Sequence, residues 1–442
     1  MKKINGTLVL VVIAMLFTGT IYSQAVTTQP RVSQKAVAYQ IIGLSKTKVV
    51  YSRPAVNDRE VWGKLVPYNA PWRAGANENT TITFGDNVKI EGKELAAGTY
   101  GIHMIPTETT WEIAFSTNST AWGSFSYNPK DDALRVTVTP TKSDHYYELL
   151  TYTFDGVEAE SAVCALQWAD KKIPFKIEVD VHTVVLASLR DELQTQAGFT
   201  WMGWTEAANY CLKNDINHKE ALGWATRSAF INPNSRNLMT KAQLTAKVKG
   251  DGKGKDYAKK GGASYTENEI IVATLEKDLS TFPVTWKEWH NAANWCSKNE
   301  MNAKALEMVD KSIAMNASMT NMMTKAKLLK STGNEKDAKK VKEEAITKGS
   351  NAELNNYGYQ LLQGGNTAGA VEVFEANVEK NPTDPNAWDS LGEGYFNNGQ
   401  KEKAINSFKK SLSLNPPANV KANSLKILKQ MGVDMNEEKS TP

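Results

Sequence analysis

The architecture of the C-terminal half is clearest in PNAWDSLGEGYFNNGQKEKAINSFKKSLSLNP, residues 385–416. Its large apolar side chains recur at helical spacing, with Trp388 and Tyr395 in the first part and Phe408 in the second. The small residues Gly392 and Ala404 allow two helices of a pair to approach each other closely. The stretch therefore predicts two packed helices.

The same pattern occurs one period earlier, in AELNNYGYQLLQGGNTAGAVEVFEANVEKNP, residues 352–382. Gly358 there corresponds to Gly392, and Phe374 corresponds to Phe408, which gives a 34-residue period. Both segments resemble tetratricopeptide repeats, in which such residues fill the space between stacked helix pairs. We expect repeats at 352–384 and 385–418, followed by a capping helix at 419–431.

A longer period lies upstream, where FTWMGWTEAANYCLKNDIN (199–217) aligns with VTWKEWHNAANWCSKNEMN (284–302). These two segments are offset by 85 residues, and the match extends in both directions to cover about 186–332, which gives a period of about 85 residues. It predicts a module of four helices duplicated in tandem. Together with the shorter repeats it predicts an all-α solenoid of tetratricopeptide type over 183–433.

The duplication also explains the cysteines, of which the chain has three. Cys211 and Cys296 occupy equivalent places in successive modules, several helix layers apart, whereas a disulfide needs Cα atoms within about 7 Å. We expect both to be small buried helix residues. The Lys-rich segment KVKGDGKGKDYAKKGG (247–262) lacks a phosphate-loop motif and is interpreted as a solvated turn, the alternative being a basic contact for an anionic partner.

Before about residue 181 the periodicity is that of strands, with alternating apolar residues cut by turn sequences. Ten short strands are expected, at 36–42, 48–53, 80–84, 88–90, 98–105, 111–116, 134–139, 148–154, 161–168 and 175–181. Short antiparallel strands without helical segments between them are typical of a β-sandwich or jelly roll. The chain is thus predicted to be multidomain, with an all-β domain at 29–182 ahead of the solenoid.

Several long segments of this region, in order, carry a family resemblance. They are QPRVSQKAVAYQIIG (29–43), VVYSRPAVNDREVWGKLVPYNAPWRAGANENTTITF (49–84), LAAGTYGIHMIP (95–106), WGSFSYNP (122–129) and FKIEV (175–179). The region resembles the domain-of-unknown-function family 2911, common in secreted proteins of Bacteroidetes. The resemblance implies an extracytoplasmic β domain and supplies no catalytic residue.

Residues 1–25 have the features of a secretory signal peptide. Lys2 and Lys3 precede an unbroken apolar run from Leu8 to Phe17, and small residues follow at Ser23 and Ala25. The run is too short to span a membrane comfortably, no other apolar run approaches 18 residues, and no cysteine marks a lipidation site. We expect a protein secreted into the periplasm, neither lipidated nor anchored by a transmembrane helix in its mature form.

Composition and motifs argue against several function classes. The formal net charge of +4, without a large block of one sign outside the Lys-rich segment 247–262, does not favour nucleic acid as a partner. The five histidines show no metal-ligand spacing, and no G-x-S-x-G motif occurs. No catalytic residue, metal or other cofactor is therefore predicted, and a non-enzyme is favoured. His103 is expected to lie in a strand with its ring satisfied by neighbours.

The best candidate ligand site in the β domain is the proline-braced segment VPYNAPWRAGANENTT, residues 66–81, together with an arginine just before it. Aromatic faces suit a sugar and arginine offers a fixed fork of donors, so these residues could hold a glycan or a carboxylate. The candidates are Arg53, Tyr68, Trp72, Arg73, Asn77 and Glu78. The alternative is structural: Arg73 pairs with Glu78 and the segment closes one end of the sandwich.

Three functions remain open. The first is a protein-interaction scaffold that takes a protein or peptide partner in the cell envelope on its solenoid. Polar residues that suit such a groove are Asn355, Asn356, Asn386 and Lys421. The second is glycan or small-ligand binding by the β domain, with hydrolysis less favoured, and the third is a purely structural envelope protein.

Overall fold

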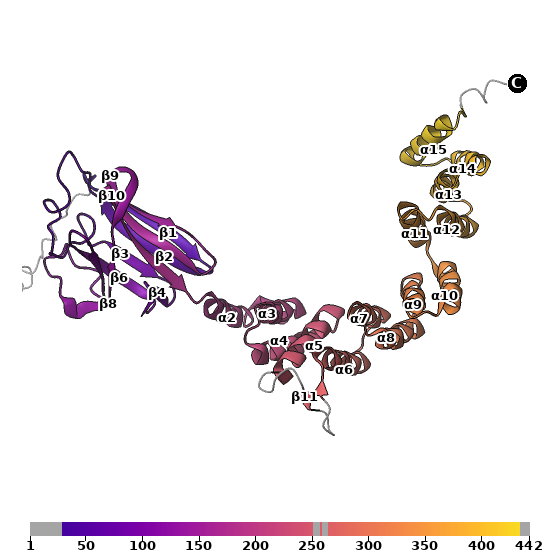
Figure 1. Ribbon diagram of the computed structural model, residues 1–442, viewed down its shortest axis with the longest axis horizontal. Coiled ribbons are helices and arrows are strands. Elements are labelled where there is room, and N and C mark those ends of the chain that lie inside the picture. Colours follow the sequence, from indigo (N-terminus) through magenta and orange to yellow (C-terminus); the bar gives the residue numbers. More distant parts are fainter. Residues whose placement is uncertain (1–28, 251–256, 259–263, 434–442) are drawn as a thin grey trace, which may run out of the picture. The chain divides into compact units, whose positions relative to one another are not determined.

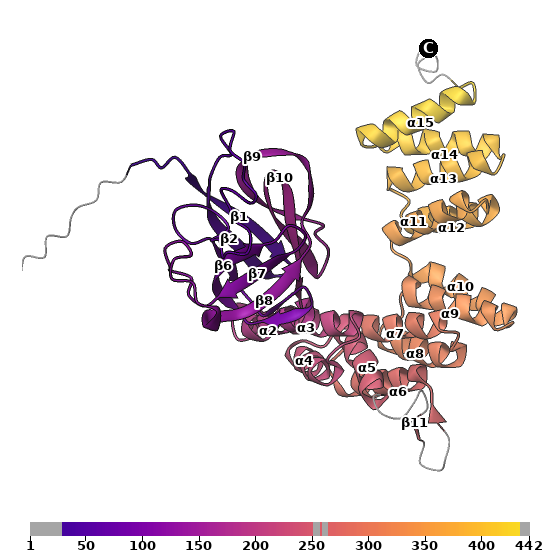
Figure 2. The ribbon, with the colours of Figure 1, turned by 60° about the vertical axis from the view of Figure 1, so that its left-hand side comes forward.

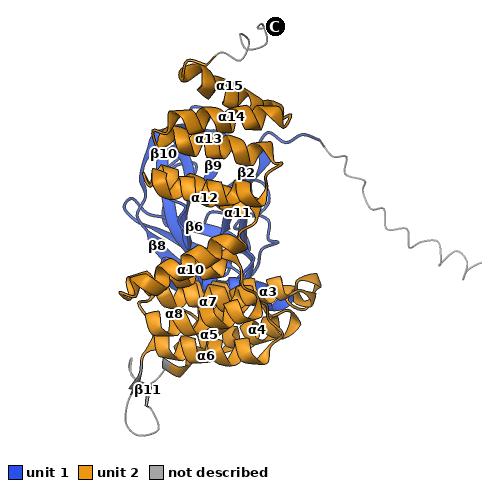
Figure 3. Cartoon of the chain, turned by 90° about the vertical axis from the view of Figure 1, so that its right-hand side faces the viewer, with its two compact units in different colours: residues 1–191 blue, residues 192–442 orange. Residues whose placement is uncertain are grey.

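The structure is a computed structural model that describes residues 29–250, 257–258 and 264–433. The chain divides into two compact units, residues 1–191 and 192–442 (Figure 3). The expected signal peptide at 1–25 and most of the Lys-rich segment 247–262 lie outside the described residues.

The first unit contains two antiparallel sheets (Figure 1). The six-stranded sheet has the order β1-β2-β3-β6-β7-β8, and the four-stranded sheet has the order β5-β4-β10-β9. The strands are β1 (Gln34–Ile42), β2 (Ser45–Arg53), β3 (Thr81–Phe84), β4 (Val88–Ile90), β5 (Lys93–Leu95), β6 (Gly98–Pro106), β7 (Trp111–Ser116), β8 (Asp132–Val138), β9 (Thr141–Asp155) and β10 (Ser161–Val179). The predicted all-β sandwich class is confirmed.

Two strand predictions were wrong. The strands expected at 161–168 and 175–181 are one long strand, β10, and the short strand β5 was not anticipated. The N-terminal part of β10 pairs with β9 and its C-terminal end pairs with β4. Within the part that pairs with β9, Ala169 has a φ of 50° at a shift of register. Between the two paired parts, Pro174 has no N–H to donate. These residues interrupt the alternation in the sequence without ending the strand.

Alternating side chains of both sheets fill one core. Trp111 and Phe115 of β7 meet Trp168 and Phe175 of β10 among fully buried aliphatic residues. Burying a large apolar side chain contributes about 1.5–3 kcal/mol relative to exposure, so this layer dominates the stability of the unit. The opposite face of the six-stranded sheet carries Lys35, Ser52, Thr81 and His103, each one strand step from a core residue.

The described residues contain 14 α-helices (Figure 2). They are α2 (Val181–Glu192), α3 (Trp201–Lys213), α4 (His218–Ile231), α5 (Ser235–Gly250), α6 (Glu267–Thr281), α7 (Trp286–Lys298), α8 (Asn302–Met315), α9 (Met319–Ser331), α10 (Glu335–Lys348), α11 (Asn351–Gln363), α12 (Thr367–Lys380), α13 (Pro385–Asn397), α14 (Lys401–Ser413) and α15 (Ala418–Gln430). Short 3-10 turns lie at Pro129–Asp131 and Gln196–Phe199, and a two-stranded ribbon joins β11 (Tyr257–Ala258) to β12 (Ser264–Tyr265). The predicted helical-repeat class is confirmed.

The longer of the two periods is visible in both helices and hydrogen bonds. Helices α3 and α7 start at equivalent positions, Trp201 and Trp286. In the second module, buried Asn321 donates to Ser312 Oγ at 3.0 Å and to the Asn316 carbonyl at 2.8 Å. In the first module, buried Asn237 makes the equivalent bonds to Ser228 and Asn232 at the same distances. Equivalent side chains therefore join successive helices in both copies.

The shorter repeats pack glycine against phenylalanine. A Cβ built at Gly358 would lie 2.3 Å from the Phe374 ring, and one at Gly392 would lie 2.7 Å from the Phe408 ring. Both rings are fully buried. Helices α11 and α13 can approach their partners α12 and α14 this closely only because these positions lack a side chain.

Burial accounts for the cysteines. Cys164, Cys211 and Cys296 are buried and form no disulfide among the described residues, as expected for Cys211 and Cys296 from their places in the repeat. Burial raises the pKa of Cys164 and raises that of Cys296 to about 11. Both thiols therefore remain protonated and unreactive at neutral pH.

Candidate functional site

A row of polar side chains runs across the last three alternate helices of the repeat unit. Asn355 on α11, Asp389 on α13 and Asn423 on α15 occupy the same position of successive repeats. Helix α13 contacts both α11 and α15, so one repeat position presents adjacent hydrogen-bonding groups on neighbouring helices. The constant spacing of these residues in the sequence could have identified this row in advance.

The row is connected by hydrogen bonds. Asn423 donates from its amide nitrogen to Asp389 Oδ2 at 2.8 Å and to Glu393 Oε1 at 2.6 Å. Ser424 donates to the other carboxylate oxygen of Asp389. Tyr359 lies 3.2 Å from Ser390 through their hydroxyl groups. We call these six residues, together with Asn355, the repeat row.

The repeat row contains two carboxyl groups whose charge is not balanced by a nearby cation among the described residues. Burial raises the pKa values of the Asp389 and Glu393 carboxyls, and their hydrogen bonds, with the more distant charge of Lys426 on Glu393, oppose that shift only in part. In the part of the chain that the structure describes, no ion pair includes either carboxylate. The Asn355 side-chain oxygen is buried and has no hydrogen-bond partner there. The row thus offers acceptors that lack a cationic donor.

The predicted groove residues are not brought together as a group. Asn355 belongs to the repeat row, whereas Asn356 and Lys421 are placed at other repeat positions, with Lys421 exposed. Asn386 is half-buried at the start of α13, where its backbone N–H donates to the capping carboxylate of Asp384 at 2.9 Å. Sequence polarity alone did not distinguish the residues that face neighbouring helices from those that face solvent.

In the β unit, most of the predicted ligand residues serve the fold. Arg53 donates to the Leu150 carbonyl at 2.9 Å and to Thr151 Oγ1 at 2.6 Å, which ties β2 to β9. Trp72 stacks on Trp168 with ring centroids 5.9 Å apart, and its backbone pairs with that of Met104. The Trp72 ring therefore belongs to the edge of the core.

Tyr68 and Arg73 lie against glycines. A Cβ at Gly63 would contact the Tyr68 ring at 2.9 Å, and one at Gly123 would contact Arg73 Nη1 at 2.5 Å. The Arg73 Nε is buried without a hydrogen-bond partner among the described residues. Arg73 and Glu78 do not form the pair that the structural interpretation expected, because Glu78 is bonded to Arg31 instead.

Asn77 and Glu78 anchor the segment before β1. Asn77 donates to the Ser33 carbonyl at 2.9 Å, and Arg31 donates to the Glu78 carboxylate. The backbone hydrogen bond and Arg31 hold the pKa of Glu78 below its usual value. Of the six predicted residues, Glu78 is the one that lines the cavity on the outer face of β1, β2 and β3.

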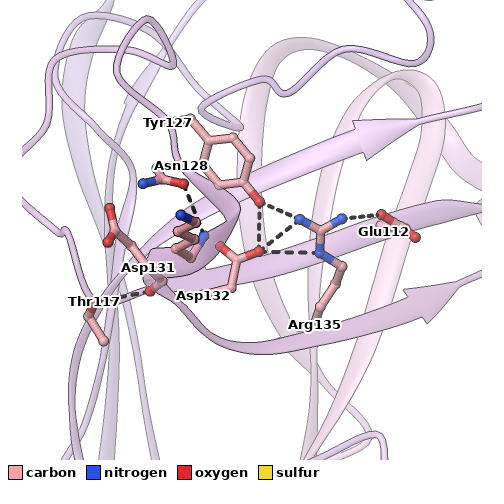
Figure 4. A network of polar contacts seen from close by, with 8 residues as sticks. Glu112, Thr117, Tyr127, Asn128, Asp131, Asp132 and Arg135 are labelled. Carbon is pink, nitrogen blue, oxygen red and sulfur yellow. Dashed lines mark hydrogen bonds and ion pairs between the residues drawn. The ribbon is translucent and has the colours of Figure 1, made fainter.

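A second polar cluster lies around the 3-10 turn before β8 (Figure 4). Arg135 donates to Glu112 at 2.7 Å and to Asp132 at 2.8 Å, and Tyr127 donates to Asp132 at 2.7 Å. His103 lies beside it, 2.9 Å from Ser124 Oγ and 4.6 Å from the Tyr127 ring centroid. The arginine is paired with two carboxylates, so the cluster fastens the 117–131 loop to β6, β7 and β8.

The described part of the chain offers neither a metal site nor a membrane span. Among residues 29–250, 257–258 and 264–433, no group of three or more His, Cys, Asp or Glu side chains is arranged to hold a metal ion. Within those same ranges, none of the helices combines the length and apolar character needed to cross a membrane.

Repeat geometry and sequence comparison agree on the class of the helical half. Residues 385–418 match the family described as tetratricopeptide repeat. Residues 33–177 match the family described as protein of unknown function (DUF2911). Both predicted resemblances are confirmed. No curated protein matches the chain.

Solved structures similar to the chain include several repeat proteins. YrrB, described as a TPR protein with an unusual peptide-binding site, is 13% identical, with 55% of this chain and 97% of YrrB covered and a TM-score of 0.21. The C-terminal part of a TPR repeat-containing protein from Cytophaga hutchinsonii is 11% identical, with coverages of 48% and 78% and a TM-score of 0.26. MamA from Desulfovibrio magneticus RS-1 is 21% identical, with coverages of 33% and 90% and a TM-score of 0.21.

Proposed function

We propose that this chain is a secreted, non-catalytic scaffold that holds a protein or peptide partner on its helical repeats. Repeated helix pairs present continuous surfaces whose equivalent positions recur from one repeat to the next, which suits an extended partner. The observation that carries the proposal is the repeat row, where Asp389 and Glu393 are hydrogen-bonded by neutral groups but lack an ion-pair partner among the described residues.

Charge complementarity indicates the class of partner. A buried carboxylate is costly unless a cation or several donors compensate it, and a raised pKa is the sign of incomplete compensation. A lysine or arginine from a partner would supply the missing charge. The free oxygen of Asn355 would accept a further hydrogen bond from the partner's backbone or side chain. The favoured partner is therefore a segment with a basic residue.

A peptide library displayed against the mature chain tests this proposal. We expect the retained peptides to share a lysine or arginine, and Glu393→Gln to weaken their binding at least tenfold, measured by calorimetry. Glu402→Gln, at an exposed position on α14, is the matched control and should bind like the wild type. Retained peptides without a basic residue, or equal affinities for both variants, would contradict the proposal.

The secreted location rests on the leader at 1–25, where two lysines precede the apolar run. When the full chain is expressed in a Gram-negative host, we expect it in the periplasmic fraction with a new N-terminus near Ser23 to Ala25. Mass spectrometry of the intact protein measures this. Cytoplasmic protein that retains residues 1–25 would refute secretion and leave the partner proposal unaffected.

A further inference from the structure

The cavity in the β unit is separate from the repeat row. It has a volume of about 310 Å³ and lies between the outer face of β1, β2 and β3 and the loop that follows β7. That volume is near the lower end of the range of about 300–1,000 Å³ for small-ligand pockets. The polar side chains that line it are Lys35, Ser52, Glu78, Asn79, Thr81, Ser119 and Thr120.

The lining contains a buried polar group that needs a partner. Asn79 is 7% exposed, and its side-chain oxygen has no hydrogen-bond partner among the described residues. Its amide nitrogen reaches only the Asn118 carbonyl, at 3.5 Å. Leaving such an oxygen unsatisfied costs about 1–3 kcal/mol, which a ligand hydroxyl bound here could recover.

The charges around the cavity favour a neutral ligand. Arg31 is bonded to Glu78, so the one carboxylate at the cavity already has a cation. Lys35 would attract an anion, but Glu78 would repel it. Glu78 would attract a cation, but Lys35 and Arg31 would repel it. The hydroxyl groups of Ser52, Thr81, Ser119 and Thr120 line the remainder, and each can both donate and accept a hydrogen bond.

An exposed aromatic side chain follows the cavity lining in the sequence. Trp122 is 57% exposed and directly follows Ala121, which lines the cavity. The guanidinium of Arg31 lies 5.8 Å from the Trp122 ring centroid, so the same arginine contacts both the indole and Glu78. An exposed indole beside hydroxyl and amide groups suits a ligand with an apolar face and several hydroxyls.

We propose that this cavity binds a neutral polyhydroxylated ring, a monosaccharide unit of a glycan. Asn79 and Thr81 contact its hydroxyls inside the cavity, and Trp122 covers its apolar face at the rim. This site shares only Glu78 with the ligand residues expected from the sequence. It is independent of the repeat row and lies in the other unit of the chain.

The test uses the mature chain and a panel of glucose, galactose, mannose and N-acetylglucosamine, with binding at millimolar concentrations measured by saturation-transfer NMR and calorimetry. At least one sugar should bind to the wild type. We expect Thr81→Val to weaken that sugar three- to tenfold and Trp122→Ala to weaken it at least tenfold. Thr83→Val, one step along the same face of β3 but outside the cavity, is the matched control.

Three outcomes would overturn the proposal: no sugar binds, Thr83→Val and Thr81→Val weaken binding equally, or acetate or phosphate competes with the sugar. Near-UV circular dichroism verifies that each variant retains the aromatic core. Glu393→Gln should leave sugar binding unchanged, so failure of the sugar site and failure of the partner site are distinguishable.

Discussion

At the scale of single residues, burial sets the protonation of His103. The ring is 1% exposed on the outer face of β6, under the 117–131 loop. Desolvation lowers its pKa from 6.5 to about 4, against the opposing attraction of Asp132. The strand location and the satisfied ring were predicted correctly, whereas the loop that covers the ring could not be inferred from alternation along β6.

The lowered pKa has a consequence for stability. Above pH 6.5 the ring is neutral in both folded and unfolded chains, so the full contribution of its burial is present. As the pH falls toward 4 the unfolded chain binds the proton first, and about 3 kcal/mol of stability is lost. We expect His103→Gln to show a correspondingly smaller loss between pH 7 and 4 in urea unfolding, and NMR titration of His103 to give a midpoint near 4. A midpoint near 6.5 would contradict this account.

At the scale of helices and strands, two kinds of close contact hold the repeats together. Glycines admit the buried rings of Phe374 and Phe408, and asparagines fasten one helix to the next. The two repeat periods predicted which positions are equivalent because side chains in stacked repeats meet the same neighbours. Only the structure shows which ring packs against each glycine and which groups accept hydrogen bonds from each asparagine.

The glycine contact predicts that alanine substitution changes stability in opposite directions at a packed and at an exposed helical glycine. Gly392→Ala should destabilise the repeat unit by about 1–3 kcal/mol, because the added methyl must displace the Phe408 ring. Gly223→Ala, on the exposed face of α4 with no atom within 4 Å of the added carbon, should stabilise it by about 0.5–1 kcal/mol through helix propensity. Thermal unfolding followed by circular dichroism at 222 nm measures both. Equal changes in stability at the two sites would show that the Phe408 ring leaves room for a methyl group at Gly392.

The asparagine contact predicts that its removal makes the backbone amides of α8 and α9 exchange their hydrogens faster with solvent. Asn321→Ala removes both bonds that join α8 to α9 and leaves buried acceptors unpaired, which should cost about 2 kcal/mol. Hydrogen exchange of the α8 and α9 amides measures the effect, with exposed Asn406→Ala as the control. Unchanged exchange in Asn321→Ala would mean that apolar packing alone holds the two helices together.

At the scale of the whole molecule, each unit has its own core. One apolar cluster is confined to the first unit, and three clusters of the second unit lie between Ala229 and Val433. The change from strand to helix periodicity places the division at 182/183, whereas the compact units divide at 191/192. The difference is physical, because Val181 and Val184 of α2 pack against the β core and Val181 fills the space beside Gly43.

The separate cores predict that the first unit folds alone. Residues 29–191 should give cooperative unfolding and the near-UV signal of the Trp62, Trp72, Trp111 and Trp168 cluster. Residues 29–182 should be less stable by about 1 kcal/mol, since Val184 is lost. Urea unfolding of the two fragments measures this. An unfolded 29–191 fragment, or equal stabilities, would contradict the role assigned to α2.

The strands and the repeated helix pairs of this chain can be predicted from its sequence alone. Alternation identified most strands of the sandwich, and the repeat lengths identified helix pairs, because both patterns follow from which side of an element faces a core. The sites, in contrast, depend on tertiary contacts. Glu78 pairs with Arg31 and not with Arg73, and the side-chain oxygen of Asn79 has no hydrogen-bond partner among the described residues. Asn423 donates to both Asp389 and Glu393. These relations join residues that are distant in the chain or leave a group unpaired, and local sequence carries no record of either.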